Sequence, residues 1–591
     1  MPNMTGGEIV AEYLIKEGVP YLFGVPGHGN MGFLEGVRNH QDKLKPILTR
    51  HEQIAAFMAD GYYRVAHRPV ATFSSCGPGS INVLIGVAEA MSNSVPFLAI
   101  TGNVPTSQSN SGALQETFFH QGADFPQVIR GFCKKSFPVS RVDRLPNILG
   151  QAFKTMLTGR PGPVNIDVPY DLWMEKADVE IPEPREWAGN VEPRVPGNPE
   201  TVKKALDLLL SVQRPLILAG GGVILSEGWD ELKGLSEKTG VPVYTSLMGK
   251  GAMAENHELC LGVAGAFGVH PANEAARSAD VILALGCRFS DIHASSWIPG
   301  YTYNIPPTKL IQVDIDPAEI GRNYPVEIGI VADAKTVLGQ LVEMAKDQPK
   351  RELSKWHGEL EQAKREWQEW TKPKCESDEV PIAVQRQLTD MREILPDDAI
   401  VTGDAGNAAA WVGQYFTTFK PKTHHQPGGF SSMGWGPSSI LGCKLAAPDS
   451  VCVAVIGDGA FMMTPQVVAT AVEYEIPTIW IIHNNYTLGA ISWLQEAVYS
   501  GEIAAYFKRH KTGERWNPDF VKLAEASGGM GERITKPEEF KPALERAIKA
   551  NWPYVLDVII EPEGGCPTTA GWQMPPMAIL GPSFGKPRVR K

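Results

Sequence analysis

The sequence predicts an α/β protein of three doubly wound domains, each built around a parallel sheet. Three observations support this fold class. The chain has 591 residues, which is too many for a single core. Short apolar runs alternate with helical patterns, as is typical of parallel sheets covered by helices. Two stretches break the alternation: residues 182–199 are rich in proline and charge, and a charged helical pattern fills residues 344–381.

These breaks divide the chain into three units and a tail. We expect an N-terminal domain at residues 1–180, a central domain at 195–343, a C-terminal domain at 375–565 and a tail at 566–591. An amphipathic helix opens the first domain, and "YLFGVPG", "VATFSSCGPGS" and "VPFLAITGN" are its strand-and-turn signals. The run "PVNIDV" near its end resembles "PYVLDV" near the end of the third domain, which is compatible with two similar domains.

The composition favours a small-molecule enzyme over other classes. No apolar run approaches the roughly 20 residues that span a bilayer, so no membrane role is expected. The net charge of −11 comes without a basic block, which argues against a nucleic-acid partner. The N-terminus lacks the basic and apolar regions of a signal peptide, and the eight cysteines form no CxxC pair. We therefore expect a cytoplasmic protein with buried, reduced thiols.

The stretch at residues 457–485, "GDGAFMMTPQVVATAVEYEIPTIWIIHNN", places oxygen-bearing side chains at the ends of two strands. A buried strand ends at the GDG turn, Thr464 is the expected N-cap of a helix that begins at Pro465, and a second strand leads to Asn485. Asp458 and Asn485 then share the sheet edge where ligands gather. Such oxygens suit Mg²⁺, and the glycines let a diphosphate approach. Two polar turns would give the same letters, so the motif alone leaves both interpretations open.

The GDG and NN motifs at this spacing resemble the fingerprint of the thiamine-diphosphate (ThDP) enzymes. Further matches follow in the order of that family over nearly the whole chain, and the resemblance is closest to acetolactate synthases. The resemblance implies that Asp458, Asn485 and the backbone carbonyl of Thr487 hold Mg²⁺. It also implies an early glutamate that shares a proton with the aminopyrimidine of the cofactor, and "HEQIAAFMADGY" supplies Glu52. The first and third domains become the pyrimidine-binding and diphosphate-binding domains, with a nucleotide-binding-like domain between them.

Further matches nominate contacts to the cofactor. Met433 in "GFSSMGWG" resembles the apolar residue that wedges beneath the thiazolium ring, and "TGDAGN" resembles the diphosphate-binding turn. In "SSCGPGS", Cys76 replaces the serine or threonine that is usual in the family. The resemblance thus assigns to ThDP the residues Glu52, Cys76, Gly77, Ala405, Gly406, Asn407, Ser431, Met433, Gly457, Asp458, Gly459, Ala460, Asn485, Thr487, Leu488 and Gly489.

The residues expected to face the substrate leave the reaction open. We expect Glu52, His28 and Gln121 to be catalytic, and Asn30, His120, Ala490 and Trp493 to contact the substrate. The preferred function is a lyase or carboligase that acts on a 2-oxo acid, an aldehyde or a dicarbonyl. However, "GHGN" at His28 resembles ThDP enzymes that cleave cyclic diones, so a ring-cleaving hydrolase is the alternative. A non-catalytic relative is the remote alternative, and retention of the expected metal and proton residues argues against it.

The central domain carries a separate resemblance. Its turns "AGGGV", "TSLMGKG", "LGCRFSD" and "VDIDPAEIG" resemble the FAD-binding elements of acetolactate synthases, although "GVAG" at 262–265 lacks the histidine of the family's GMHG motif. FAD or an ADP-containing nucleotide is therefore expected at Gly221, Gly222, Leu247, Met248, Gly286, Arg288, Asp314, Ile315 and Asp333. Family members build each site from two chains, which implies a homodimer or homotetramer.

Overall fold

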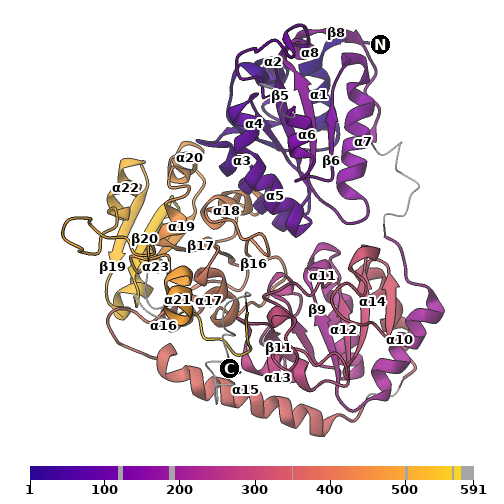
Figure 1. Cartoon of the computed structure of the whole chain (residues 1–591), viewed down its shortest axis with the longest axis vertical. Coiled ribbons are helices and arrows are strands. Elements are labelled where there is room, and N and C mark those ends of the chain that lie inside the picture. The colour runs from indigo at the N-terminus through magenta and orange to yellow at the C-terminus, as the bar shows by residue number, and fades with distance from the viewer. Residues whose placement is uncertain (118–123, 185–193, 349–350, 500–502, 562–564, 574–591) are drawn as a thin grey trace.

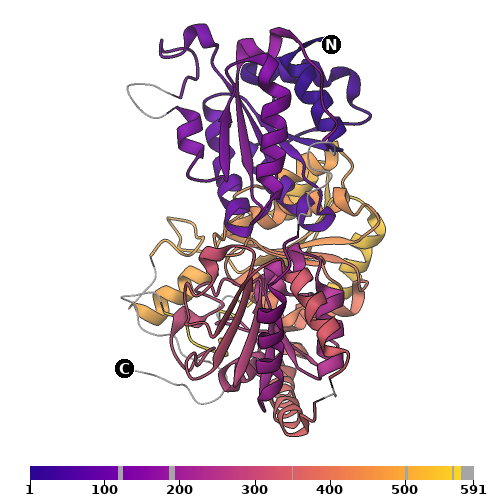
Figure 2. The same ribbon diagram turned by 90° about the vertical axis from the view of Figure 1, so that its right-hand side faces the viewer.

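The computed structural model describes residues 1–117, 124–184, 194–348, 351–499, 503–561 and 565–573. Three six-stranded sheets, each with all its strands parallel, form the cores of three domains, so the predicted fold class is confirmed. The N-terminal domain lies at one end of the molecule, and the central and C-terminal domains lie side by side at the other (Figures 1 and 2).

The N-terminal sheet has the strand order β3-β2-β4-β5-β7-β6. A short antiparallel pair, β1 (Asn3–Thr5) and β8 (Lys176–Asp178), ties the start of the domain to its end. The amphipathic helix expected at the start of the chain is α1. The strands are β2 (Tyr21–Gly24), β3 (Lys45–Leu48), β4 (Ala71–Ser74), β5 (Leu98–Asn103), β6 (Lys135–Pro138) and β7 (Val164–Pro169), and the helices are α1 (Gly6–Lys16), α2 (Met31–Val37), α3 (Glu52–Ala66), α4 (Pro78–Asn82), α5 (Leu84–Asn93), α6 (Phe125–Ile129), α7 (Leu145–Leu157) and α8 (Tyr170–Met174).

The central sheet has the order β11-β10-β9-β12-β13-β14. The chain starts at β9 in the middle, adds β10 and β11 toward one edge, and then adds β12, β13 and β14 toward the other edge. Sheets of this order bind dinucleotides where the direction reverses. Its strands are β9 (Pro215–Ala219), β10 (Val243–Thr245), β11 (Cys260–Val263), β12 (Val281–Leu285), β13 (Lys309–Asp314) and β14 (Ile328–Val331), and its helices are α10 (Pro199–Ser211), α11 (Gly221–Leu225), α12 (Trp229–Thr239), α13 (His270–Ser278) and α14 (Ala334–Ala345).

The C-terminal sheet, β16-β15-β17-β18-β20-β19, repeats the topology of the N-terminal one. The echoed runs "PVNIDV" and "PYVLDV" form β7 and β20, which occupy the same position in the two sheets, so two domains are indeed alike. The strands are β15 (Ile400–Gly403), β16 (His424–His425), β17 (Cys452–Gly457), β18 (Ile479–Asn484), β19 (Met530–Ile534) and β20 (Tyr554–Ile559), and the helices are α16 (Val384–Ile394), α17 (Asn407–Tyr415), α18 (Trp435–Ala446), α19 (Asp458–Phe461), α20 (Val467–Glu473), α21 (Gly489–Val498), α22 (Phe520–Ala526) and α23 (Pro537–Ala550).

The charged stretch between the second and third domains is the long helix α15 (Ser354–Cys375), which runs beneath both domains (Figure 1). Only Trp356, Leu360 and Ala363 of this helix are buried, so it is a surface connection, as its charge pattern predicted. All eight cysteines are free thiols, and all but the half-buried Cys375 are buried. Among the described residues, no helix is both long and apolar enough to cross a bilayer.

The N-terminal and C-terminal domains share a core through α3 and α18. One apolar cluster includes side chains of both domains. Glycines let the two helix backbones meet: a Cβ added at Gly61 would lie 2.1 Å from the Ser439 carbonyl oxygen, and one added at Gly442 would lie 2.0 Å from that of Met58. This helix pair therefore fixes how the first domain sits on the third.

Candidate active site

Asp458 and Asn485 meet at the carboxyl edge of the C-terminal sheet. Asp458 follows β17, and Asn485 follows β18, the neighbouring parallel strand. The Asp458 carboxylate accepts the N–H of Tyr486 over 2.7 Å, which joins the two strand ends directly. Asp458 is also the first residue of α19, so "GDG" starts a helix where the sequence predicted only a turn. The structure thus brings the expected metal ligands together.

The Asp458 carboxylate lies in a buried, polar setting and is only 1% exposed. Besides Tyr486, its oxygens accept the Gly459 N–H and the Asn517 side-chain amide, each over 2.7 Å. Burial nevertheless raises the pKa of Asp458 to about 7. A buried carboxylate is stabilised in its charged form by a nearby cation, so this donor set fits a hard divalent ion.

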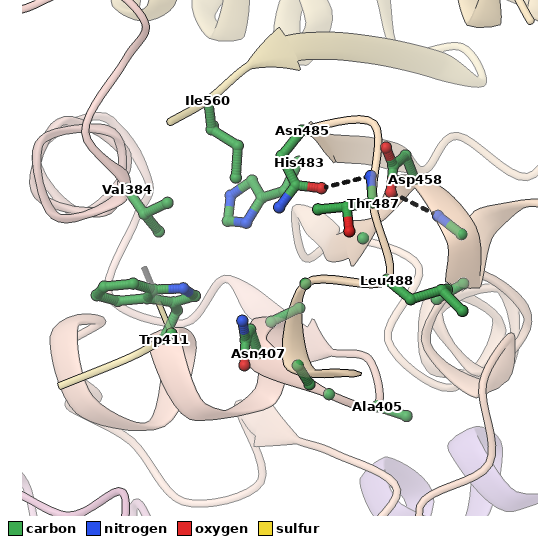
Figure 3. Close-up of a pocket in the computed structure, with 18 of the residues that line it drawn as sticks. Val384, Ala405, Asn407, Trp411, Asp458, His483, Asn485, Thr487, Leu488 and Ile560 are labelled. Atoms are coloured by element: carbon green, nitrogen blue, oxygen red, sulfur yellow. Dashed lines mark hydrogen bonds between the residues drawn. The ribbon is translucent and has the colours of Figure 1, made fainter. Parts of the chain in front are cut away.

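A cavity of about 380 Å³ opens at this edge of the sheet (Figure 3). An added Cβ at Gly489 would lie 3.1 Å from Asn485 Nδ2 and 3.2 Å from Asn407 Nδ2, so this glycine keeps open a space faced by two amides. Helices α17 and α21 both begin here, and their free N–H groups favour an anion. The cavity is lined by these residues expected to bind cofactor: Ala405, Gly406, Asn407, Ser431, Met433, Gly457, Asp458, Gly459, Ala460, Asn485, Thr487, Leu488 and Gly489.

The opposite wall of this cavity consists of residues that the sequence reasoning missed. Val384 and Trp411 lie across from Asp458 in Figure 3, with His483 between. His483 precedes Asn485 by two positions, so it lies on the same side of β18, and this alternation was the available signal. Its Nε2 lies 3.0 Å from Gln387 Oε1, and burial lowers the pKa of His483 to about 4. His483 is therefore neutral at physiological pH.

The helix between the two strand ends differs from its prediction. Thr464 does not cap it: α20 begins at Val467 after an uncapped Gln466, and residues 462–466 form turns. The Thr464 hydroxyl instead donates to the Gly434 carbonyl over 3.2 Å. The prediction of a cap was wrong because the Thr464 hydroxyl is hydrogen-bonded to the distant Gly434 carbonyl and does not accept an N–H of the helix.

Glu52 begins α3 as expected, but it does not line the cavity that Asp458 lines. Its side chain is 8% exposed, and it accepts the Asn82 amide over 3.0 Å. Helix α3 runs antiparallel to α18, because Asp60 contacts Trp435 at the start of α18 whereas Met58 contacts Gly442 near its end. Glu52 thus lies beyond the far end of α18, away from the Met433 turn of its own chain.

His28 and Cys76 form a close pair in the N-terminal domain. His28 lies in the short 3-10 helix η1 (His28–Asn30), and its Nε2 is 3.3 Å from Cys76 Sγ. Burial raises the pKa of the Cys76 thiol, so Cys76 is protonated near neutral pH. Gly77 follows with φ of 60°, a conformation that glycine adopts readily, and leads into α4.

Asn30 is fully buried and holds the turn that carries His28. It accepts the Gly27 N–H over 3.0 Å and donates to the Val25 carbonyl over 3.1 Å. These bonds hold the turn in place, and the expected substrate contact of Asn30 stays a prediction. His120 and Gln121 lie outside the described residues.

A second cavity, of about 670 Å³, lies between the three domains. Gly406, Asn407, Ser431 and Ala490 line both cavities, so the two adjoin, and Trp493 lines the second. All the residues expected to bind a nucleotide line the second cavity: Gly221, Gly222, Leu247, Met248, Gly286, Arg288, Asp314, Ile315 and Asp333.

Two features of the second cavity bear on its ligand. The glycine-rich turn has a packing reason, because a Cβ added at Gly286 would lie 2.5 Å from Gly222 Cα. Close packing therefore explains these glycines, and they do not by themselves indicate a phosphate-binding turn. Three carboxylates, Asp291, Asp314 and Asp333, line the cavity together with six basic side chains, five of which form ion pairs. The basic side chains are Arg64, Arg160, Arg194, Lys250, Arg288 and Lys422.

Three parallel-sheet domains, with a cavity bounded by helix amino ends and a buried carboxylate, define an enzyme that binds a diphosphate cofactor. Comparison with known families gives the class. Residues 4–123, 202–341 and 404–558 match the N-terminal, central and C-terminal domains of the thiamine pyrophosphate enzymes, respectively.

Individual relatives narrow the class. The probable acetolactate synthase large subunit of Methanococcus aeolicus is 37% identical over 95% of this chain and 92% of its own length. The probable acetolactate synthase large subunit of Methanocaldococcus jannaschii is 36% identical over 100% of this chain and 97% of its own length. The large subunit of acetolactate synthase isozyme 3 from Escherichia coli is 32% identical over 93% of each chain. The chain thus belongs to the thiamine pyrophosphate enzymes and, within them, to the acetolactate-synthase-like, ThDP-dependent enzymes that make or break carbon–carbon bonds.

Proposed function

We propose that this protein is a Mg²⁺- and ThDP-dependent carboligase that takes a 2-oxo acid, releases carbon dioxide and transfers the remaining fragment to a carbonyl acceptor. The observation that carries the proposal is the cavity in which Asp458, Asn485 and two helix amino ends converge. The similarity to acetolactate synthase large subunits over nearly the whole chain supports it.

The residues of this cavity fit a magnesium diphosphate at one end and a ring system at the other. Asp458, Asn485 and the Thr487 carbonyl would hold Mg²⁺, while the amides of Asn407 and the N–H groups at Gly489 would bind the diphosphate. Met433 would lie under the rings. When bound, ThDP would supply a nucleophilic carbon that adds to the substrate carbonyl, and a thiazolium ring that takes up the electron pair left when the carbon–carbon bond breaks. Glu52 would exchange a proton with a ring nitrogen of the cofactor.

We further propose that a complete site contains two chains. Glu52 lies away from the Met433 turn of its own chain, yet both are needed at one cofactor. A homodimer or homotetramer in which the first domain of one chain faces the third domain of another would satisfy both. In that arrangement His28 and Cys76 reach the same site as Glu52, because all three belong to the same domain.

The reaction is tested by offering the Mg²⁺-ThDP holoenzyme pyruvate, glyoxylate and cyclohexane-1,2-dione separately. We expect carbon dioxide release from a 2-oxo acid and a new carbon–carbon bond in the product. Inertness toward both 2-oxo acids would refute the proposal, and opening of the dione ring by water would then identify the hydrolase that His28 suggests. His28→Phe should suppress such ring opening, because its imidazole would move the proton.

Asn517→Ala is expected to weaken Mg²⁺ binding about tenfold, because groups that orient a metal ligand typically contribute this much. Asn517 links the proposed metal ligand Asp458 to the end of β18: its Nδ2 donates to Asp458 Oδ2 over 2.7 Å and to Asn484 Oδ1 over 2.9 Å. The measurement is a Mg²⁺ titration of the apoenzyme at saturating ThDP. Asn147→Ala, at a half-buried position of α7 in the N-terminal domain, is the control that should leave Mg²⁺ affinity unchanged. Unchanged Mg²⁺ affinity in Asn517→Ala would contradict the orienting role.

We propose that the second cavity binds FAD or an ADP-containing nucleotide. Its position at the carboxyl edge of the central sheet favours a dinucleotide, and the Arg288 guanidinium in its wall offers a cation to a diphosphate. Arg288 lines the cavity in a half-buried position, where burial lowers its pKa, and its guanidinium donates to the Ser92 carbonyl over 2.7 Å. A half-buried guanidinium paired with a carbonyl is well suited to an added phosphate.

Arg288→Ala is therefore expected to weaken nucleotide binding about tenfold or more, the usual effect of a lost charge-assisted hydrogen bond. Titrations with FAD and with ADP, followed by flavin fluorescence and calorimetry, measure it. Arg322→Ala is the matched control, since Arg322 pairs with Glu319 at the surface outside the cavity. Equal affinities of Arg288→Ala and the native protein for both nucleotides would refute the assignment.

A further inference from the structure

The turn that carries Met433 is held at both of its neighbouring amides by buried carboxylates. We call residues 426–435 the wedge turn. The Ser432 N–H donates to Glu89 Oε2 over 2.8 Å, and the Gly434 N–H donates to Asp404 Oδ2 over 2.9 Å. Both carboxylates are 0% exposed. Carboxylates are strong acceptors, so the peptide planes on either side of Met433 have defined directions.

The hold from Glu89 crosses between domains, because Glu89 lies on α5 of the N-terminal domain. One turn later on α5, the Asn93 amide donates to the Glu89 carboxylate and, over 2.8 Å, to the Pro427 carbonyl. Arg64 on α3 donates to the Gln426 carbonyl over 2.7 Å. Two helices of the first domain therefore contact successive peptide groups of the wedge turn.

A need to hold the two domains together does not explain why a buried carboxylate stands at position 89. The close packing of α3 against α18 and the shared apolar core already join the first domain to the third. Burial raises the pKa of Glu89 to about 7, so a buried carboxylate is a costly means of adhesion, and an apolar side chain often serves as well or better. The Glu89 carboxylate accepts one particular N–H, that of Ser432, and a need to fix the geometry of the wedge turn explains this contact better.

We propose that Glu89 is a positioning residue of the cofactor site, which accepts the Ser432 N–H and thereby keeps the Met433 side chain in place beneath the cofactor. This inference rests on the role proposed for Met433 above. Glu89 touches neither cofactor nor substrate and acts through the backbone. Ser431 belongs to the same turn, has φ of 60° and lines both cavities, so a displaced turn would alter both.

Side-chain length distinguishes positioning from a role for charge. Glu89→Asp keeps the carboxylate but shortens its reach toward the Ser432 N–H by one methylene. Glu89→Gln removes the charge but keeps an acceptor oxygen at the native reach. The single oxygen of Glu89→Gln can accept the Ser432 N–H, while its NH2 group would face the Asn93 amide. We therefore expect Glu89→Gln to lie closer to the native protein than Glu89→Asp, and Glu89→Asp to behave like Glu89→Ala.

The readout is the exchange rate of the thiazolium C2 proton in the full-length holoenzyme with saturating Mg²⁺ and ThDP. We expect Glu89→Asp and Glu89→Ala to slow this exchange about 10-fold to 100-fold, as misplacement of a reacting group does, and to change ThDP affinity less than about threefold. Met433→Ala should also slow the exchange. Adding Glu89→Asp to Met433→Ala should cause no further loss, because the two residues act through one contact.

The control is Glu473→Gln, which breaks the surface ion pair with Arg50 between the same two domains and should leave exchange unchanged. Independent effects of Glu89→Asp and Met433→Ala would overturn the proposal. So would slow exchange in Glu89→Gln with native exchange in Glu89→Asp, or a lower Tm with native exchange in every Glu89 variant. Native exchange in Met433→Ala would instead refute the role of Met433, and slow exchange in Glu89→Asp would then still support the hold on the turn.

Discussion

Replacing Asp458 with alanine is expected to abolish Mg²⁺-dependent retention of ThDP and to lower turnover at least about 10³-fold, or roughly 4 kcal/mol of transition-state free energy. The carboxylate is the only charged ligand in the proposed metal set, and the remaining carboxamide and carbonyl oxygens cannot balance a divalent ion. Binding is measured by calorimetry with ThDP at several Mg²⁺ concentrations, and turnover with the 2-oxo acid that proves active.

The matched control for this variant is Asp519→Ala. It removes a carboxylate from the same domain, where Asp519 caps α22 by accepting the Lys522 N–H over 3.1 Å. Loss of a helix cap costs about 1 kcal/mol of stability and should leave ThDP affinity unchanged. If Asp458→Ala still bound ThDP in a Mg²⁺-dependent manner with nearly native affinity, the assignment of the metal site would be wrong.

Replacing Glu52 with glutamine is expected to lower turnover about 10²-fold to 10⁴-fold, the usual contribution of a general acid–base group, while the protein still folds and binds ThDP. Glutamine has the same shape but cannot exchange a proton with the cofactor. The direct measurement is again the exchange of the thiazolium C2 proton, which should become slow. Fast exchange in this variant would contradict the role of Glu52.

Mixing the two inactive variants tests whether a site contains two chains. If Glu52 of one chain serves Asp458 of another, a dimer of one Glu52→Gln chain and one Asp458→Ala chain has one intact site. Random pairing would then restore up to about a quarter of native activity, because half the dimers are mixed and half their sites are intact. Co-expression of two Glu52→Gln chains is the control. Absence of recovery in the mixture would indicate that each site lies within one chain.

Features that depend on neighbouring residues were predictable from the sequence. Strand and helix periods placed Asp458 and Asn485 at neighbouring strand ends, and the strand-to-helix step placed Glu52 at the start of α3. The order of the motifs along the chain carries the resemblance to the ThDP enzymes, and that resemblance implied the cofactor. The same local reasoning failed for Thr464, whose hydroxyl bonds a carbonyl 30 residues away in sequence.

Features that depend on distant residues were not predictable in this way. Asn517 contacts Asp458 from 59 positions along the chain, and Glu89 contacts Ser432 from 343 positions along it. Neither asparagine nor glutamate has a local pattern that indicates such a partner. The polarity of β18 did hold a signal for His483, since it shares a side of the strand with Asn485.

The sequence by itself determined the fold class and the residues at the carboxyl edge of the third sheet, because these follow from periodicities and spacings of a few residues, and the resemblance of its ordered motifs to the ThDP enzymes implied the class of cofactor. Only the tertiary structure decided that Glu52 lies away from the Met433 turn of its own chain, that the two cavities adjoin, and that Glu89 holds the wedge turn. These depend on how α3 packs against α18, which close-packed side chains and backbones from distant parts of the chain determine together.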